Sequence, residues 1–222
     1  MEIKAVIFDL DGTLLNSIED IADANNMMLQ EFGHPIHSLK KYVTWIGNGA
    51  RTLVEASLPL EKRNGNTSHY VNRFEYYYSE NLNVKSNLYP NIDKVLDMLT
   101  EKHIPFAIHT NKPQHLTQIV VEHYLKNWSF SNVLGQSPRF PRKPDPSGAL
   151  YLALQLGCPP QNILFVGDSL VDMQTAKSAG MIPMGVSWGF GKPADSDNNI
   201  KMVHRPQEMI DYLLANIKIS ES

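Results

Sequence analysis

The sequence has very few residues that could form a disulfide or a zinc site. It contains a single cysteine, Cys158, so no intrachain disulfide can form. Cys158 follows an expected helix and has no second cysteine or histidine at metal-ligand spacing, and we therefore interpret it as structural. The eight histidines are also scattered without such spacing. A disulfide scaffold is excluded, and a histidine metal site is disfavoured.

The chain also lacks long hydrophobic runs and a strong excess of one charge. No apolar stretch approaches the length needed to span a membrane, and Asp9 interrupts the apolar N-terminal segment that a signal peptide would require. With a formal net charge of -3 and 42% hydrophobic residues, the composition is that of an ordinary globular protein. We expect a cytoplasmic protein that binds neither nucleic acid nor a membrane surface.

The most informative stretch lies at the N-terminus. Apolar residues from Ala5 to Phe8 run directly into Asp9, a pattern typical of a buried parallel strand that ends at its carboxyl edge. Asp9 and Asp11 are two residues apart, so their side chains point the same way in an extended segment, and Gly12 permits a sharp turn after them. Two adjacent carboxylates are costly to ionise together, so either a divalent cation neutralises one or the other keeps a proton. Taken alone, the pair also fits solubilising acids at a strand end.

Hydrophobic periodicity divides the rest of the chain into two regions. From about residue 16 to residue 85 apolar residues recur at helical spacing, with a capping-box pattern at residues 17–20 and no strand. Beyond residue 91, strands are expected at 104–109, 132–134, 163–166 and 182–186, and helices at about 92–99, 113–126, 146–156, 173–179 and 207–217. Residues 194–199 are expected to form an exposed loop.

The alternation of strands and helices beyond residue 91 predicts an α/β fold with a doubly wound parallel sheet, to which the first strand belongs. We therefore predict an α/β core of residues 1–15 and 86–222, with an inserted all-helical domain of residues 16–85.

Polar residues stand where the expected strands end. They are Asp9, Asp11, Thr110, Asn111, Asp168 and Asp172, with Lys143 in a turn-rich loop. Ligands of open parallel sheets bind beyond the carboxyl ends of the strands, so these side chains are expected to converge. The four acids require a hard cation, for which Mg²⁺ is suitable, whereas Thr110 and Lys143 can donate hydrogen bonds to phosphate oxygens. A carboxylate can accept a phosphoryl group, and a second acid can protonate the leaving oxygen and then activate water.

In their order along the chain, these residues resemble the four motifs of the haloacid dehalogenase-like hydrolase superfamily. The motifs correspond to Asp9–Thr13, Thr110, Lys143 and Gly167–Asp172. The segments Trp-Ile-Gly-Asn-Gly-Ala at 45–50 and Thr-Asn-Lys-Pro at 110–113 are similar to the phosphoglycolate phosphatase subgroup. The resemblance covers nearly the whole chain. It implies a Rossmann-like hydrolase core and a helical cap that closes over the substrate.

The resemblance also implies a role for each motif residue. Asp9 would be the nucleophile and Asp11 the general acid and base, and Lys143 and Thr110 would hold the phosphoryl group. The implied Mg²⁺ site consists of Asp9, Asp11 (through its backbone carbonyl) and Asp168, with Asp172 either orienting this cluster or binding the metal through water. The expected substrate contacts are Thr110, Asn111, Lys143, Gly12 and Arg51. Asp11 argues against dehalogenation, because family members that displace halide need neither this acid nor the metal.

Several residues outside the motifs need separate interpretation. Arg51 could reach a substrate carboxylate, but a solvated surface arginine fits the sequence equally well. Lys112, Lys192 and Arg205 are interpreted as surface charges. His109 stands before Thr110, where relatives often have a small or apolar residue, and the loop from residue 136 to residue 142 is unusual for the family. Either feature could alter the pocket.

The predicted function is a Mg²⁺-dependent phosphatase acting on a small phosphorylated metabolite, with 2-phosphoglycolate as the expected substrate. Two alternatives remain open on sequence alone. One is a sugar phosphomutase of the same superfamily, which would need a longer-lived aspartyl-phosphate. The other is a catalytically silent module that binds a phosphorylated metabolite, although binding alone would not require both Asp9 and Asp11. The protein is expected to be a monomer or a homodimer.

Overall fold

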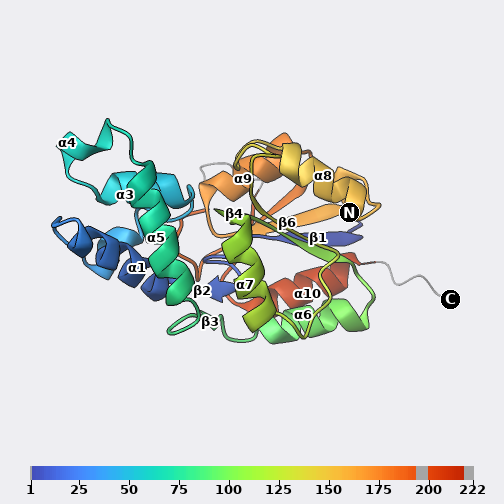
Figure 1. Ribbon diagram of the computed structural model, residues 1–222. Helices are drawn as coiled ribbons and strands as arrows, with labels where there is room; N and C mark the ends of the chain where they lie inside the picture. The colour runs from blue at the N-terminus through green and yellow to red at the C-terminus, as the bar shows by residue number, and fades with distance from the viewer. Residues whose placement is uncertain (1, 194–199, 218–222) are drawn as a thin grey trace.

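The computed structural model describes residues 2–193 and 200–217, and its centre is a six-stranded parallel sheet (Figure 1). The strands lie in the order β5-β4-β1-β6-β7-β8. Their bounds are β1 Ala5–Phe8, β4 Phe106–Pro113, β5 Asn132–Gln136, β6 Ile163–Gly167, β7 Ile182–Val186 and β8 Lys201–Val203. The first strand of the chain therefore lies inside the sheet, paired with β4 on one side and β6 on the other.

Helices cover both faces of this sheet. Alternate strand residues face opposite ways, so Val6 and Phe8 pack with helices α6 (Ile92–Glu101), α7 (Gln114–Tyr124) and α10 (Pro206–Asn216). Ile7 and Phe165 pack on the other face, with α8 (Ser147–Gln155) and α9 (Leu170–Ser178). This arrangement confirms the predicted α/β class with a doubly wound parallel sheet.

The elements predicted beyond residue 91 agree with the structure, apart from two differences at strands, and the two-residue strands at 15–16 and 87–88 were also not predicted. The expected strand at 104–109 begins later, at Phe106, and continues through Thr110 and Asn111 to Pro113. The short edge strand β8, with only three residues, was not predicted because it has no clear alternating pattern. The loop predicted at 194–199 lies outside the described residues. Within the described residues, no helix has the length and apolar character needed to cross a membrane.

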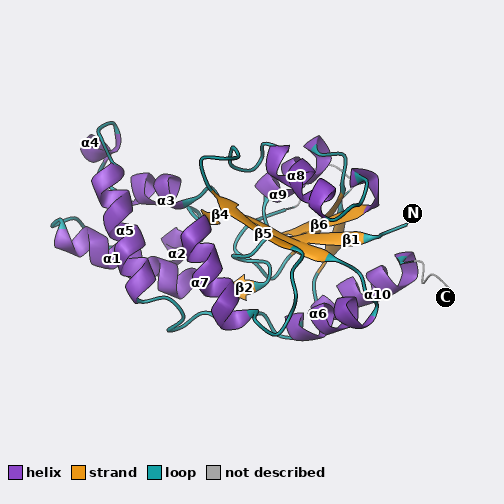
Figure 2. Ribbon diagram, turned by 45° about the vertical axis from the view of Figure 1, so that its right-hand side comes forward, coloured by secondary structure: helices purple, strands orange, loops and turns teal. Residues whose placement is uncertain are grey.

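Five helices occupy the segment between β1 and α6, and Figure 2 shows them gathered at one end of the sheet. Their bounds are α1 Ile18–Glu31, α2 Leu39–Tyr42, α3 Ala50–Ser57, α4 Leu60–Arg63 and α5 Ser68–Glu80. Their apolar faces form a hydrophobic cluster of their own, with Met28, Tyr42, Val54 and Phe74 among its buried members. The division into a core of residues 1–15 and 86–222 and a cap of residues 16–85 stays our proposal.

The chain enters and leaves the helical region through a small antiparallel ribbon. Strands β2 (Leu15–Asn16) and β3 (Asn87–Leu88) pair there. The predicted capping box at residues 17–20 is wrong in detail, because Ser17 donates to the carboxylate of Asp11 and makes no side-chain cap. Asp20 instead accepts hydrogen bonds from the backbone N–H groups of Lys85 and Ser86. A buried carboxylate therefore joins the start of α1 to the returning chain.

Candidate active site

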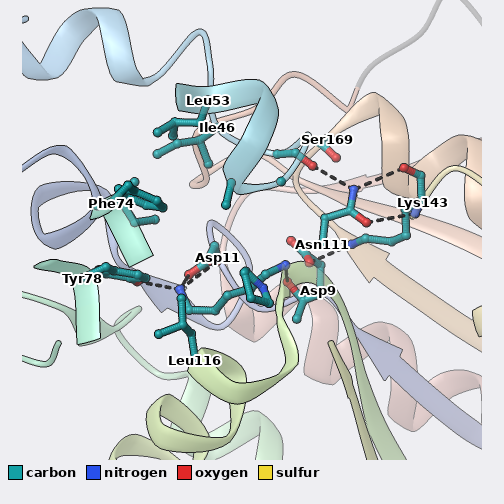
Figure 3. A pocket seen from close by; sticks show the side chains of 17 residues that line it. Asp9, Asp11, Ile46, Leu53, Phe74, Tyr78, Asn111, Leu116, Lys143 and Ser169 are labelled. Carbon is teal, nitrogen blue, oxygen red and sulfur yellow. Dashed lines mark hydrogen bonds and ion pairs between the residues drawn. The ribbon is translucent and has the colours of Figure 1, made fainter. Parts of the chain in front are cut away.

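The carboxyl ends of β1, β4 and β6 meet the helical region at a pocket (Figure 3). From the sheet side, the pocket is lined by Asp9, Asp11, Thr110, Asn111, Lys112, Pro113, Leu116, Lys143 and Ser169. From the helical side, it is lined by Ile21, Ile46, Gly47, Gly49, Ala50, Leu53, Phe74 and Tyr78. One wall is thus polar and charged, and the opposite wall is mostly apolar.

A buried lysine joins two of the predicted acids. The Nζ atom of Lys143 lies 2.7 Å from Oδ1 of Asp9 and 2.5 Å from Oδ1 of Asp172. All three side chains are buried. Burial alone would lower the pKa of Lys143, but the charges of Asp172 and Asp9 outweigh this effect and raise the pKa above its usual value. Lys143 therefore keeps its charge and holds two carboxylates that are far apart in the chain.

The site contains more acidic side chains than cationic ones. Burial raises the pKa of Asp9 well above its usual range, and Lys143 reverses only part of this shift. The Asp172 and Asp168 carboxylates raise it further. Burial and the charge of Asp172 likewise raise the pKa of Asp168. Raised pKa values in acids that lie this close indicate a place where an additional positive charge would stabilise the ionised forms.

The loop after β7 positions Asp168. Oδ2 of Asp168 accepts hydrogen bonds from the backbone N–H groups of Phe190 and Gly191, at 2.7 and 2.9 Å. Two glycines allow this approach. A Cβ atom on Gly12, whose φ is +91°, would lie 2.2 Å from the carboxylate of Asp168, and one on Gly189 would lie 2.3 Å from its Cβ. The predicted turn at Gly12 is therefore also a close-packing requirement.

Three of the four predicted metal residues form one compact group. One ligand atom from each of Asp9, Asp168 and Asp172 lies within 4.8 Å of the others, and all three residues are buried. Carboxylate oxygens are the ligands that Mg²⁺ prefers, and the excess of acids over Lys143 leaves charge for a cation to neutralise. The donor set therefore fits Mg²⁺. The side chain of Asp11 is outside this group.

The carboxylate of Asp11 pairs with a lysine that sequence reasoning placed on the surface. Nζ of Lys112 lies 3.0 and 3.1 Å from the two carboxylate oxygens of Asp11, and 2.5 Å from the hydroxyl of Tyr78 on α5. Ser17 donates to the same carboxylate at 2.6 Å. Only 5% of Lys112 is exposed. The surface interpretation of Lys112 is wrong, because the helical region covers this part of the sheet edge.

Asn111 connects the Lys143 loop to the helical region. Its side-chain oxygen accepts from the backbone N–H of Lys143 at 2.9 Å, and its amide nitrogen donates to the carbonyl oxygens of Lys143 and Gly47. Thr110 lines the pocket, and its hydroxyl oxygen accepts from the backbone N–H of Lys112 at 3.3 Å. The structure therefore brings the predicted residues Thr110, Asn111 and Lys143 together.

Two predicted substrate residues do not line the pocket, and the first is Arg51. Its guanidinium donates to the hydroxyls of Thr67 and Ser68, and it lies 3.6 Å from the carboxylate of Glu55. Half of its side chain is exposed, and it is not among the residues that line the pocket. The surface alternative describes this position better. The second is Gly12, which has no Cβ atom and so allows the carboxylate of Asp168 to approach it closely.

The structure also shows the positions of residues that the sequence analysis interpreted as lying outside the motifs. Cys158 is buried and unpaired, in keeping with the structural interpretation. Lys192 and Arg205 are exposed, as expected. His109 is buried beneath the site against the ring of Phe165, and burial, with a smaller effect of the Lys143 charge, lowers its pKa to about 3. It is therefore a neutral core residue at ordinary pH.

Sequence reasoning missed three contributors to the site, namely Lys112, Tyr78 and the Gly189–Gly191 loop. Tyr78 stands at helical spacing with other aromatic residues of α5, a pattern that indicates packing, and its burial in the helical cluster supports that role. The loop had a usable signal, since two glycines flank one residue shortly after an expected strand. Nothing in the local sequence distinguishes Lys112 from a surface lysine.

Comparison with known proteins places this geometry in context. The family model described as haloacid dehalogenase-like hydrolase matches residues 6–186. A protein named phosphoglycolate phosphatase from Mannheimia succiniciproducens is 38% identical over 196 residues, which cover 85% of this chain and 88% of that protein. A second protein named phosphoglycolate phosphatase, from Psychrobacter arcticus, is 32% identical over 223 residues, which cover 96% of this chain and 97% of that protein.

A solved structure has the same overall arrangement. The crystal structure titled as a predicted phosphoglycolate phosphatase from Haemophilus somnus superposes with a TM-score of 0.83 at 31% identity. The superposition covers 96% of this chain and 99% of that one.

Proposed function

Because this chain belongs to the haloacid dehalogenase-like hydrolase family, we propose that it is a phosphatase that hydrolyses a small phosphomonoester through an aspartyl-phosphate on Asp9. The observation that carries the proposal is the position of Asp9 at the end of β1, lining the pocket with Lys143 at 2.7 Å. A buried carboxylate beside a buried ammonium at a strand end suits an acceptor for an anionic group.

The side chains at the pocket support both halves of the reaction. A carboxylate oxygen of Asp9 attacks phosphorus, and the ester oxygen leaves with a proton from Asp11. Asp11 then takes a proton from water, whose oxygen attacks phosphorus and frees inorganic phosphate and Asp9. Lys143 and the backbone around Thr110 stabilise the charge on the transferred group. The helical wall of the pocket excludes bulk water from the reacting atoms.

We propose Mg²⁺ as the cofactor, held by Asp9, Asp168 and Asp172, with Asp11 contributing its backbone carbonyl. When bound, Mg²⁺ would supply positive charge that offsets the negative charge on the oxygens of a bound phosphate. Lys143 fixes the orientation of Asp9 and Asp172, and the Phe190 and Gly191 N–H groups fix Asp168. These contacts hold the carboxylates in place before any cation arrives.

We propose 2-phosphoglycolate as the substrate, on the basis of relatives that carry the name phosphoglycolate phosphatase at 32–38% identity. The mostly apolar helical wall has few groups for the hydroxyls of a sugar, which favours a short substrate over the sugar phosphate of a mutase. A silent binding module is disfavoured because Asp9, Asp11 and Lys143 all line the pocket.

A panel of phosphate esters tests the proposal. The purified protein is incubated with 2-phosphoglycolate, sugar phosphates and an aryl phosphate, with and without Mg²⁺, and phosphate release is measured. We expect release that depends on Mg²⁺ and is fastest with 2-phosphoglycolate. Interconversion of sugar phosphates without phosphate release would support the mutase, and binding without any turnover would support the silent module.

A further inference from the structure

The pocket holds a second buried cation that the proposed phosphoryl-transfer reaction does not use. Among the described lining residues the only cations are Lys112 and Lys143, and Lys143 is paired with Asp9 and Asp172. Lys112 comes from β4, the same strand as Thr110, and is almost completely buried. A buried ammonium that faces a ligand pocket is costly unless an anion compensates for it.

The contacts of Lys112 allow it to bind a ligand in addition to Asp11. Its Nζ atom meets both carboxylate oxygens of Asp11 at nearly equal distances, and its other contact is the hydroxyl of Tyr78. An ammonium has three donors, and a bidentate contact can become a single one with little movement, which frees a donor for a ligand. Figure 3 shows Lys112's two partners, Asp11 and Tyr78, beside the pocket, on the side away from Lys143.

We propose that Lys112 is the specificity-determining residue of this enzyme and receives the carboxylate of the substrate. The inference rests on the proposed phosphatase function and extends it to a substrate class, the short phosphate esters that carry a second anionic group. With Lys143 at the phosphoryl end and Lys112 at the other, the two cations of the pocket match the two charged ends of such an ester. The apolar side chains Ile46, Leu53 and Phe74 leave no other charged partner for a carboxylate on the helical wall.

The alternative is that Lys112 only ties the helical region to the sheet edge through Tyr78. The two roles differ in how they treat substrates with and without a carboxylate. We therefore propose measuring kcat/KM for 2-phosphoglycolate and for ethyl phosphate, which has two carbons and no carboxylate, in the wild type, in Lys112→Met and in Tyr78→Phe. Tyr78→Phe removes the hydroxyl contact but keeps the cation, and it serves as the matched control.

The expected result is a change in preference. Loss of one charge-assisted contact reduces the preference of Lys112→Met for 2-phosphoglycolate over ethyl phosphate by about 10- to 100-fold. Tyr78→Phe keeps the preference of the wild type within about threefold. An equal fall in kcat/KM for both esters in Lys112→Met would show that Lys112 only links the helical region to the sheet edge or acts through Asp11. This result would overturn the inference.

A second measurement needs only the wild type, in case Lys112→Met does not fold. Inhibition by 3-phosphonopropionate, an uncleavable isostere of 2-phosphoglycolate, is compared with inhibition by propylphosphonate, which lacks the carboxylate. We expect the first to bind about tenfold or more tightly than the second. Equal inhibition with intact phosphatase activity would overturn the inference alone, whereas the absence of phosphate release from every ester would overturn the proposed function.

Discussion

Nζ of Lys143 lies 2.7 Å from Oδ1 of Asp9, although the two residues are 134 positions apart in the chain. The same nitrogen contacts Asp172, so a single buried ammonium supports two buried carboxylates. Removal of one partner from such a cluster usually leaves an unpaired buried charge, which destabilises the fold. Here the remaining acid still pairs with Lys143, and this makes it possible to test catalysis at Asp9 separately from stability.

Asp9→Asn should abolish turnover and leave the protein folded. An amide is nearly isosteric with the carboxylate but is a poor nucleophile, and Lys143 keeps Asp172 as its partner. We expect kcat to fall by several orders of magnitude, about 10⁴-fold or more, with an unfolding free energy within about 1 kcal/mol of wild type. Asp93→Asn, an exposed acid in the first turn of α6, is the control and should keep full activity. Activity within tenfold of wild type would show that Asp9 is not the acceptor.

Asp11→Asn should separate the two steps of the reaction. An alkoxide needs a proton to leave, whereas an aryl oxide does not, so the first step should slow about 10²- to 10⁴-fold with 2-phosphoglycolate and much less with an aryl phosphate. Water activation is lost with both esters. Stopped-flow measurement with the aryl phosphate should show a burst of the aryl alcohol and then a slow steady state. Equal slowing of the first step with both leaving groups would contradict the acid–base role.

Arg142→Met should weaken closure of the helical region. The Arg142 guanidinium donates to the carbonyl of Asn48 at 2.7 Å and to the hydroxyl of Thr52 at 3.1 Å, and so joins the Lys143 loop to the helical wall. Because these contacts are exposed, we expect a modest rise in KM for 2-phosphoglycolate, about three- to tenfold. Arg139→Met is the control on the same loop, since Arg139 packs over the rings of Phe140 and Tyr151. Equal effects of the two variants would rule out a role in closure.

His109→Gln should reduce the acid sensitivity of the fold. The pKa of His109 is lowered to about 3 by burial, whereas an unfolded histidine titrates near pH 6.5. Between these values only the unfolded state binds the proton, so wild-type stability falls as the pH drops from about 6.5 towards 3. Glutamine does not titrate there. From pH 7.5 to pH 5, the wild type should therefore lose about 2 kcal/mol more unfolding free energy than His109→Gln.

Urea unfolding at the two pH values measures this difference. Acids elsewhere titrate in both proteins and largely cancel in the comparison. A constant difference between the two proteins from pH 7.5 to pH 5 would show that His109 takes up a proton in the folded state.

Local patterns in the sequence determined the sheet and most of the acidic site. Apolar residues before Asp9 and before Asp168 predict buried strands, and the carboxyl ends of parallel strands share one edge. A strand that ends in a polar residue therefore carries positional information about the site. The same rule placed Thr110 and Asn111 correctly, even though β4 runs past them to Pro113. Parallel pairing thus let spacing along the chain predict proximity in space.

Packing between distant segments decided the rest. Lys112 is buried because α5 brings Tyr78 over it, and Arg51 is exposed because it turns towards Thr67 and away from the pocket. The loop at 189–191 meets Asp168 only after β7 has joined the sheet beside β6. A side chain's burial and partners depend on what another part of the chain places against it, and hydrophobic periodicity carries no information about that contact. For this protein, the gathering of Asp9, Asp168 and Asp172 at one edge of the sheet could be predicted from the sequence, and the burial and partners of Lys112 were decided by the tertiary structure.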